Sequence, residues 1–124
     1  MYIGVDIVDI NRVKLAIERT PRFLERIFTP GEIFYAFKHN NPYPSLAARF
    51  AAKEAFRKLH PLFIRGIRFQ DVEVINSADG RPQLFLYNNA LHQKELANID
   101  KIALSISHAK QQAIATIVAQ ERVV

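Results

Sequence analysis

The sequence has 124 residues, 49% of them hydrophobic, and we expect residues 1–124 to form one compact domain. It has no cysteine, which excludes disulfide frameworks and thiolate metal sites and fits a cytoplasmic protein. It also lacks a run of about 18 apolar residues, so no membrane-spanning helix is predicted. The 17 Lys and Arg against 12 Asp and Glu give a net charge of +5, which favours an anionic partner and equally fits a basic domain without one.

The first predicted element is a strand with a carboxylate in its middle. Residues 2–9, YIGVDIVD, form a short apolar run typical of a strand, and its acidic residues argue against a signal peptide. Val5 and Ile7 lie on the face opposite Asp6, and we expect both faces to be covered. A buried carboxylate needs a cation, hydrogen-bond donors or a proton. Asp6 therefore either forms a structural ion pair or binds a hard metal ion, and the strand leaves both open.

Short helical segments and then one long helix are predicted to follow. Asn11 can cap a helix that runs from about residue 12 to residue 19, and a further helical turn is expected around residues 23–27. The motif FTPGE has the pattern of a helix start, with threonine as the cap and glutamate three residues later. The long helix is SLAARFAAKEAFRKLH, residues 45–60, with Ser45 as its expected cap.

The long helix carries a basic stripe with one acidic residue beside it. At about 100° per residue, Arg49, Lys53 and Arg57 fall on one stripe, which is suited to phosphate groups. Glu54 lies off this stripe, close in angle to small and aromatic residues. It is either half of an ion pair with Lys58, one turn away, or a ligand in a site, and the helix alone leaves both open.

Asp6 and Glu54 together have the composition of a magnesium site. Proteins typically hold Mg²⁺ with one or two carboxylates, and water and substrate phosphate fill its other positions. The basic stripe next to this pair would bind the same phosphates. The two residues therefore predict a site shared by Mg²⁺ and a phosphorylated substrate.

The second half of the chain is predicted to contain four strands and one helix. Residues 67–75 alternate at period two, and the turn SADGRP joins them to a partner strand at residues 83–87. A helix is expected at residues 88–97, and KIALSISH and QAIATIVAQ predict two more strands joined by a short turn. Strands paired by hairpins predict an α+β fold in which an antiparallel sheet packs against the long helix.

The motif SISH, residues 105–108, ends one of these strands. His108 either is an ordinary surface residue or donates to a phosphate or a sugar hydroxyl. The sequence contains no HExxH, GxGxxG, Walker A or G-x-S-x-G motif. Nothing marks a serine as a nucleophile, so a hydrolase triad is not supported.

Six motifs occur in the order GVDIVDINRV, RFLERIFTPGE, ARFAAKEAFRK, FQDVEV, DGRP and SISH. In this order they resemble the holo-[acyl-carrier-protein] synthase family of the 4′-phosphopantetheinyl transferase superfamily. The resemblance runs from residue 3 to about residue 121, nearly the whole chain. RFAAKEA after an N-terminal DIV is the specific part, whereas SISH or DGRP alone would be weak.

This resemblance implies a fold and an activity. The family transfers the 4′-phosphopantetheine arm of coenzyme A to a serine of apo acyl carrier protein and releases adenosine 3′,5′-bisphosphate, a step in fatty acid biosynthesis. Mg²⁺ is the implied cofactor. Single-domain members are typically homotrimers with an active site at each subunit interface. Either Glu54 or a water held by the metal could take the serine proton, and the sequence does not choose.

The resemblance also assigns residues. Asp6 and Glu54 match the magnesium ligands, and Glu54 and Lys58 are the expected catalytic residues. The coenzyme A phosphates and adenosine are expected to contact Arg49, Lys53, Lys58, Ser107 and His108. The basic face of the first helices is expected to dock an acidic helix of the carrier protein through Arg12, Arg22 and Arg26.

Two departures from the family pattern leave open an alternative to the enzyme prediction. Ala48 stands where the family usually has glycine, and residues 59–63 replace a glycine-rich turn that lies near the coenzyme phosphates. The alternative is a weak or inactive paralogue that only binds an acidic carrier-type protein. A basic nucleic-acid-binding module is a third reading, but no RRM, KH or zinc-finger signature is present. We therefore expect neither nucleic acid nor a membrane as a partner.

Overall fold

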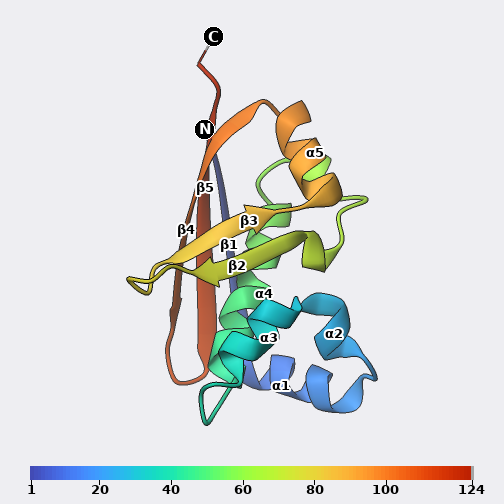
Figure 1. Ribbon diagram of the computed structural model, residues 1–124, viewed down its shortest axis with the longest axis vertical. Coiled ribbons are helices and arrows are strands. Elements are labelled where there is room, and N and C mark those ends of the chain that lie inside the picture. The colour runs from blue at the N-terminus through green and yellow to red at the C-terminus, as the bar shows by residue number, and fades with distance from the viewer. Residues whose placement is uncertain (124) are drawn as a thin grey trace.

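The computed structural model describes residues 1–123, and it confirms the predicted α+β class with antiparallel strands. Three long strands form one sheet in the order β1-β5-β4, and two shorter strands form the separate hairpin β2-β3. Figure 1 shows the helices gathered on one side of the long strands, and in this view the hairpin crosses the strands. The elements are β1 (Tyr2–Asp9), α1 (Ile10–Arg19), α2 (Phe23–Ile27), α3 (Pro30–Ala36), α4 (Tyr43–Arg57), β2 (Val72–Asn76), β3 (Pro82–Leu86), α5 (Asn88–Leu96), β4 (Ile99–His108) and β5 (Gln112–Glu121).

Helix α4 forms the centre of the core and packs against β1 and β5. Its inner alanines, including Ala51 and Ala55, are fully buried. Gly4 makes this packing close, because a Cβ atom at that position would collide with the carbonyl oxygen of Ala55. A residue without a side chain is therefore required where the strand crosses the helix.

Strand β1 is covered on one face only, which corrects the expectation that both of its faces are buried. The side chains of Ile3, Val5 and Ile7 are 65%, 49% and 57% exposed. Ile7 pairs with Ile114 of β5, which is 38% exposed. The prediction failed because a run of apolar residues does not reveal whether a second layer covers the sheet. Within the described residues, this apolar face of the sheet has no covering element.

Two helices begin earlier than predicted. Asp9 rather than Asn11 caps α1, and its carboxylate accepts a hydrogen bond from the backbone N–H of Asn11. Helix α4 begins at Tyr43, before Ser45, because a proline occupies its first turn, where the missing N–H costs little. The FTPGE prediction is confirmed, since Thr29 forms a capping box at the start of α3.

The strand predicted at residues 67–75 is shorter than expected. Residues 69–71 form a 3-10 turn, and β2 begins only at Val72. The carboxylate of Asp71 accepts hydrogen bonds from the backbone of Arg68 and from the side chain of Asn88. These contacts fold the segment back on itself, so its alternating pattern does not continue as a strand.

Candidate active site

Asp6 and Glu54 line the same cavity, which lies between β1, α1 and α4 and has a volume of about 450 Å³. The Asp6 side chain is 14% exposed and the Glu54 side chain is 28% exposed. The apolar wall of the cavity includes Phe23 and Phe50. The two carboxylates are thus on neighbouring elements and open to the same space.

Lys58, the C-cap of α4, extends back toward the strand. Its Nζ atom lies 2.7 Å from Oδ1 of Asp6 and also donates to the backbone oxygen of Val5 at 3.2 Å. Glu54 pairs instead with Arg57, with 3.7 Å between Oε1 and Nη1. The alternative pairing of Glu54 with Lys58 is therefore absent from the described ion pairs, and Lys58 joins the strand carboxylate to the helix.

The cavity fits a hard divalent cation that shares its ligands with a substrate. Asp6 and Glu54, two of the three carboxylates that line it, supply the kind and number of oxygen ligands with which proteins usually hold Mg²⁺. Within residues 1–123, no cluster of three or more His, Cys, Asp or Glu side chains forms a complete metal cage. An ion held by Asp6 and Glu54 would keep positions for water and for phosphate oxygens, which is the usual arrangement for Mg²⁺.

Arg49 lies in a second cavity of about 280 Å³. The side chain is buried, and the Nη1 atom donates to Oγ of Ser45 at 2.9 Å while Nη2 donates to Oδ1 of Asn76. The guanidinium carbon lies 4.3 Å from the ring centroid of Tyr35, close enough for a cation–π contact. Burial lowers the pKa of Arg49, against the opposing charge of Glu32. The Nε atom is buried without a hydrogen-bond partner among the described residues.

Ser107 and His108 line this second cavity from β4, and both are exposed. Ser107 pairs with Ile114 and His108 pairs with Ala113 in the β4–β5 register. Successive strand residues point to opposite faces, so Ser107 lies on the bare face of the sheet and His108 on the face toward the helices. The structure thus groups Arg49, Ser107 and His108 in one place.

Lys53, which is predicted to contact the coenzyme, lines neither of these two cavities. Its side chain is 1% exposed, and its Nζ atom lies 2.7 Å from Oε1 of Glu32. The same nitrogen donates to the backbone oxygens of Phe69 and Val72. Burial lowers the pKa of Lys53, and the charge of Glu32 opposes this. All three donors of the ammonium have protein partners, so Lys53 is a structural residue in this chain.

The two cavities share no lining residue and lie toward different edges of the sheet. Asp6 belongs to β1, whereas Ser107 and His108 belong to β4, and β5 separates these two strands. Within one chain, the structure therefore brings the predicted site residues together as two groups rather than as one. Asp6, Glu54 and Lys58 form the first group, and Arg49, Ser107 and His108 form the second.

The predicted partner-binding arginines are all exposed. Arg12 extends from α1 and lines the carboxylate cavity, while Arg22 and Arg26 lie at α2. Arg22 precedes α2 with a φ angle of 64°, a left-handed conformation that ends the α1–α2 connection. Of the three side chains, Arg12 thus provides positive charge at the carboxylate cavity, and Arg22 and Arg26 provide it at α2.

The segment that replaces the family's glycine-rich turn is an ordered 3-10 turn, Pro61–Phe63. His60 caps it by accepting a hydrogen bond from the backbone N–H of Leu62. Phe63 is fully buried and stacks on Phe56 of α4, with 4.4 Å between ring centroids. The turn directly after Lys58 is thus held by apolar packing rather than by glycine conformations.

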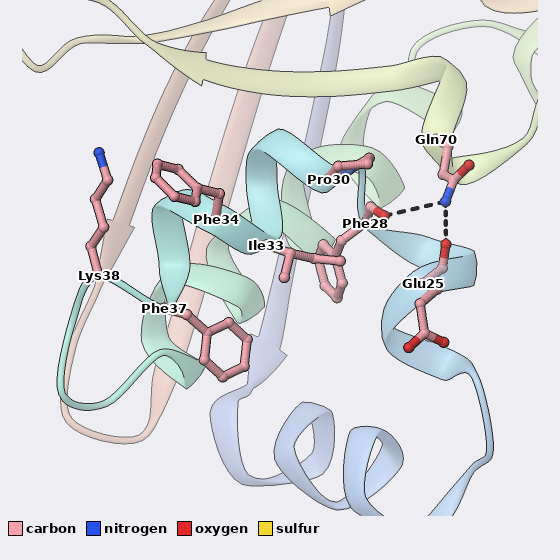
Figure 2. A pocket seen from close by; sticks show the side chains of 8 residues that line it. All are labelled: Glu25, Phe28, Pro30, Ile33, Phe34, Phe37, Lys38 and Gln70. Atoms are coloured by element: carbon pink, nitrogen blue, oxygen red, sulfur yellow. Dashed lines mark hydrogen bonds between the residues drawn. The ribbon is translucent and has the colours of Figure 1, made fainter.

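A larger cavity lies elsewhere, between α2 and α3, with a volume of about 680 Å³. Figure 2 shows its apolar lining and the side chain of Gln70, which donates to the backbone oxygens of Glu25 and Phe28. It contains none of the predicted site residues. Size alone therefore does not identify the functional cavity in this molecule.

Sequence reasoning missed two residues that hold Arg49 in place, Tyr35 and Asn76. Tyr35 follows the end of the FTPGE motif by only three positions, and Asn76 ends β2 just before the turn at Gly80. The Nδ2 atom of Asn76 donates to the backbone oxygen of Gly80 at 3.0 Å, so the hairpin turn and Arg49 are linked through one side chain. The sequence signal that could have identified Asn76 is its place as a polar residue at the end of an alternating strand.

Comparisons with known proteins agree on one family. The sequence model of the 4′-phosphopantetheinyl transferase superfamily matches residues 2–118. A holo-[acyl-carrier-protein] synthase of Clostridium tetani is 45% identical over 113 residues, which cover 91% of this chain and 90% of that protein. One from Dehalococcoides mccartyi is 43% identical over 122 residues, covering 98% of this chain and 99% of that protein.

Solved structures resemble this fold over nearly its full length. A complex of an acyl carrier protein synthase from Chronobacterium ammoniagenes with coenzyme A superimposes with a TM-score of 0.87, at 30% identity and 98% coverage of both chains. The Helicobacter pylori holo-[acyl-carrier-protein] synthase in complex with coenzyme A gives a TM-score of 0.77 at 31% identity, covering 95% of this chain and 99% of that chain.

Proposed function

Because the chain belongs to the 4′-phosphopantetheinyl transferase superfamily, we propose that it transfers the 4′-phosphopantetheine group of coenzyme A to a serine of an apo acyl carrier protein. The products are the holo carrier protein and adenosine 3′,5′-bisphosphate, and the reaction depends on Mg²⁺. The observation that carries this proposal is the shared cavity of Asp6 and Glu54, next to Lys58. We place the activity in the cytoplasm and in fatty acid biosynthesis, with residues 1–124 as one domain.

The transfer reaction takes place in the carboxylate cavity. Asp6 and Glu54 would hold Mg²⁺, which supplies charge neutralisation and polarisation of phosphate oxygens when it is bound. The serine oxygen forms a bond to the β-phosphorus, and the bond to the departing bisphosphate breaks. Glu54 takes the serine proton, since its only described partner is Arg57 at 3.7 Å. Lys58 donates to a phosphate oxygen, which stabilises the charge that develops there.

Arg49 and His108 bind the phosphate and adenosine end of coenzyme A. Support comes from Arg49, Ser107 and His108, which line the same cavity, and from the exposure of Ser107 and His108. Tyr35 and Asn76 position the guanidinium, since each contacts it from a different element. Lys53 has no part in binding here, because its three donors are used within the core.

Copies of this chain assemble as a homotrimer with active sites between subunits. The bare apolar face of the sheet, with Ile3, Val5, Ile7 and Ile114, is the surface expected to be buried between them. The separation of the two cavities supports this arrangement. Asp6, Glu54 and Lys58 of one copy and Arg49, Ser107 and His108 of the next can then contact the same coenzyme molecule. Within a single chain, the two sets of residues lie toward opposite edges of the sheet, at β1 and β4.

The acidic carrier protein docks beside the carboxylate cavity. Arg12, Arg22 and Arg26 are exposed there and provide positive charge along α1 and α2. Positive side chains in this position steer an acidic partner and fix its orientation. The target serine then enters the cavity from the side of α1.

A subunit-mixing experiment tests the activity and the shared site together. The carrier protein is incubated with coenzyme A and Mg²⁺, and mass spectrometry measures the gain of one phosphopantetheine arm. Asp6→Asn and Arg49→Leu are each expected to lose transfer, and a mixture of the two variants, unfolded and refolded together, is expected to regain it. Mixed assemblies contain interfaces at which both halves are intact, whereas sites built within one chain would stay inactive.

The wild-type reaction also separates the proposal from its alternative. A weak or inactive paralogue would bind the carrier protein in a salt-dependent manner without adding mass to it. Binding of the carrier with no transfer by the wild-type protein would therefore replace the enzyme proposal with that of a carrier-binding protein.

A further inference from the structure

Lys58 pairs with Asp6, one of the two carboxylates proposed to hold the metal ion. Its Nζ atom lies 2.7 Å from Oδ1 of Asp6 and is held from a second side by the backbone oxygen of Val5. Lys58 also follows Glu54 by one helical turn, and through Asp6 its ammonium contacts one of the carboxylates that line the cavity. The cation that satisfies Asp6 in this structure is therefore a side chain.

The charges around the cavity balance without a metal. Asp6, Asp9 and Glu54 line it, and Arg12 is the basic side chain among the lining residues. Two further cations come from outside the lining, because Arg57 pairs with Glu54 and Lys58 pairs with Asp6. Three negative groups thus face three positive ones. A site with no net negative charge attracts a free divalent cation weakly, and the ammonium repels one directly.

A diphosphate changes this balance. Each phosphate group brings negative charge and oxygen acceptors to the cavity, and Mg²⁺ in proteins commonly takes substrate phosphate oxygens among its ligands. An ammonium on a long flexible side chain can exchange Asp6 for a phosphate oxygen. The exposure of Lys58, whose side chain is 54% accessible, allows this movement without disturbing the core.

We propose that Lys58 is the resident counter-ion of Asp6 in the coenzyme-free protein, so that the divalent cation enters the site together with the diphosphate of coenzyme A. The form of the substrate that the site accepts is then the metal chelate of coenzyme A. When the chelate binds, Lys58 leaves Asp6 and donates to the diphosphate. This inference rests on the proposed function, because it takes Asp6 and Glu54 as the metal ligands.

Mn²⁺ serves as the probe, because electron paramagnetic resonance measures its free concentration directly. The full-length wild-type protein is titrated with Mn²⁺ alone and with Mn²⁺ in the presence of coenzyme A, without carrier protein so that no transfer occurs. We expect coenzyme A to tighten Mn²⁺ binding by about tenfold or more. Lys58→Met removes the resident charge, and we expect it to tighten Mn²⁺ binding by about tenfold in the absence of coenzyme A.

Two further variants serve as controls. Lys58→Arg keeps a cation beside Asp6 and is expected to bind free Mn²⁺ as weakly as the wild type. Lys101→Met removes one positive charge from β4, away from the carboxylate cavity, and is expected to leave Mn²⁺ binding unchanged. The unfolding midpoint of each variant is measured first, and the exposure of Lys58 predicts only small changes in it.

The outcomes separate this inference from the function on which it rests. If Lys58→Met binds free Mn²⁺ as weakly as the wild type, or more weakly, the counter-ion role is overturned. If Asp6→Asn binds Mn²⁺ with coenzyme A as tightly as the wild type, the proposed metal site itself fails. Tighter binding by Lys58→Met together with loss of binding by Asp6→Asn supports both.

Discussion

Lys53 and Lys58 lie five positions apart, at the end of the same helix, and have opposite surroundings. Lys53 is 1% exposed and has its three donors on Glu32 and two backbone oxygens, whereas the side chain of Lys58 is 54% exposed and reaches a carboxylate at the edge of an open cavity. Residues five apart on a helix point in different directions, so one faces the hairpin and the other faces β1. The same residue type thus stabilises the fold on one side of α4 and serves the site on the other.

The buried pair should dominate stability. Lys53→Met leaves Glu32 as a buried carboxylate without its cation, and we expect the free energy of unfolding to fall by about 3–5 kcal/mol. Lys58→Met should change it by less than about 1 kcal/mol, because exposed ion pairs contribute little. Urea denaturation followed by circular dichroism measures both. The double variant Lys53→Met with Glu32→Gln should recover part of the loss, and equal losses for the two lysine variants would remove the contrast.

The open carboxylates should dominate activity. Asp6→Asn and Glu54→Gln are each expected to lower kcat/KM for transfer by about 10²–10³-fold, because charge stabilisation by a metal is worth several kcal/mol. Neither should change the unfolding midpoint much, since both side chains reach solvent. Asp100→Asn, an exposed carboxylate on β4, is the matched control. Turnover near that of the wild type in either variant would contradict the assignment.

The residues that hold Arg49 should affect coenzyme binding rather than the chemical step. Asn76→Ala removes the acceptor for Nη2 of Arg49. A hydrogen bond to a charged group is worth about 1.5–3 kcal/mol, so we expect KM for coenzyme A to rise by about ten- to a hundredfold. The value of kcat should stay close to that of the wild type. Asn40→Ala, in an exposed loop, is the control. A fall in kcat at unchanged KM would show that Asn76 acts on the reaction itself.

The smallest expected effect is electrostatic steering by α2. Arg26→Gln should slow association with an acidic carrier protein by about threefold at low salt, and the difference should vanish near 1 M salt, where charges are screened beyond about 3 Å. Stopped-flow fluorescence with a labelled carrier measures the rate. Arg122→Gln, which lies past β5, should not change it. A deficit that persists at high salt would indicate a direct contact in place of steering.

Local patterns in the sequence predicted much of the fold. The capping box of Thr29 and Glu32 was predictable because its residues lie three apart, and the hairpin was predictable from the turn at Gly80. The starts of α1 and α4 were each displaced by two residues, because Asp9 competes with Asn11 as a cap and proline is tolerated in a first turn. Boundaries of this kind depend on small differences between neighbouring residues.

The roles of the basic residues could not be predicted in the same way. The sequence places Arg49 and Lys53 on one stripe, but the partners that bury them, Glu32 and Asn76, come from distant parts of the chain. The sequence explains Glu32 by its capping box at the start of α3, so it gives no reason to expect an ion pair with Lys53. By contrast, Asp6 was identifiable because a carboxylate in an apolar strand needs a partner wherever it lies.

The glycine at the crossing of β1 and α4 has a consequence for ion selectivity. Any side chain there would force the strand away from the helix, and the two acidic groups would separate without a change in either of them. Mg²⁺ requires oxygen ligands at about 2.0–2.1 Å, whereas Ca²⁺ accepts about 2.3–2.6 Å and a looser shell. In the proposed site, the preference for the smaller ion is therefore set partly by Gly4, a residue that has no atom with which to bind it.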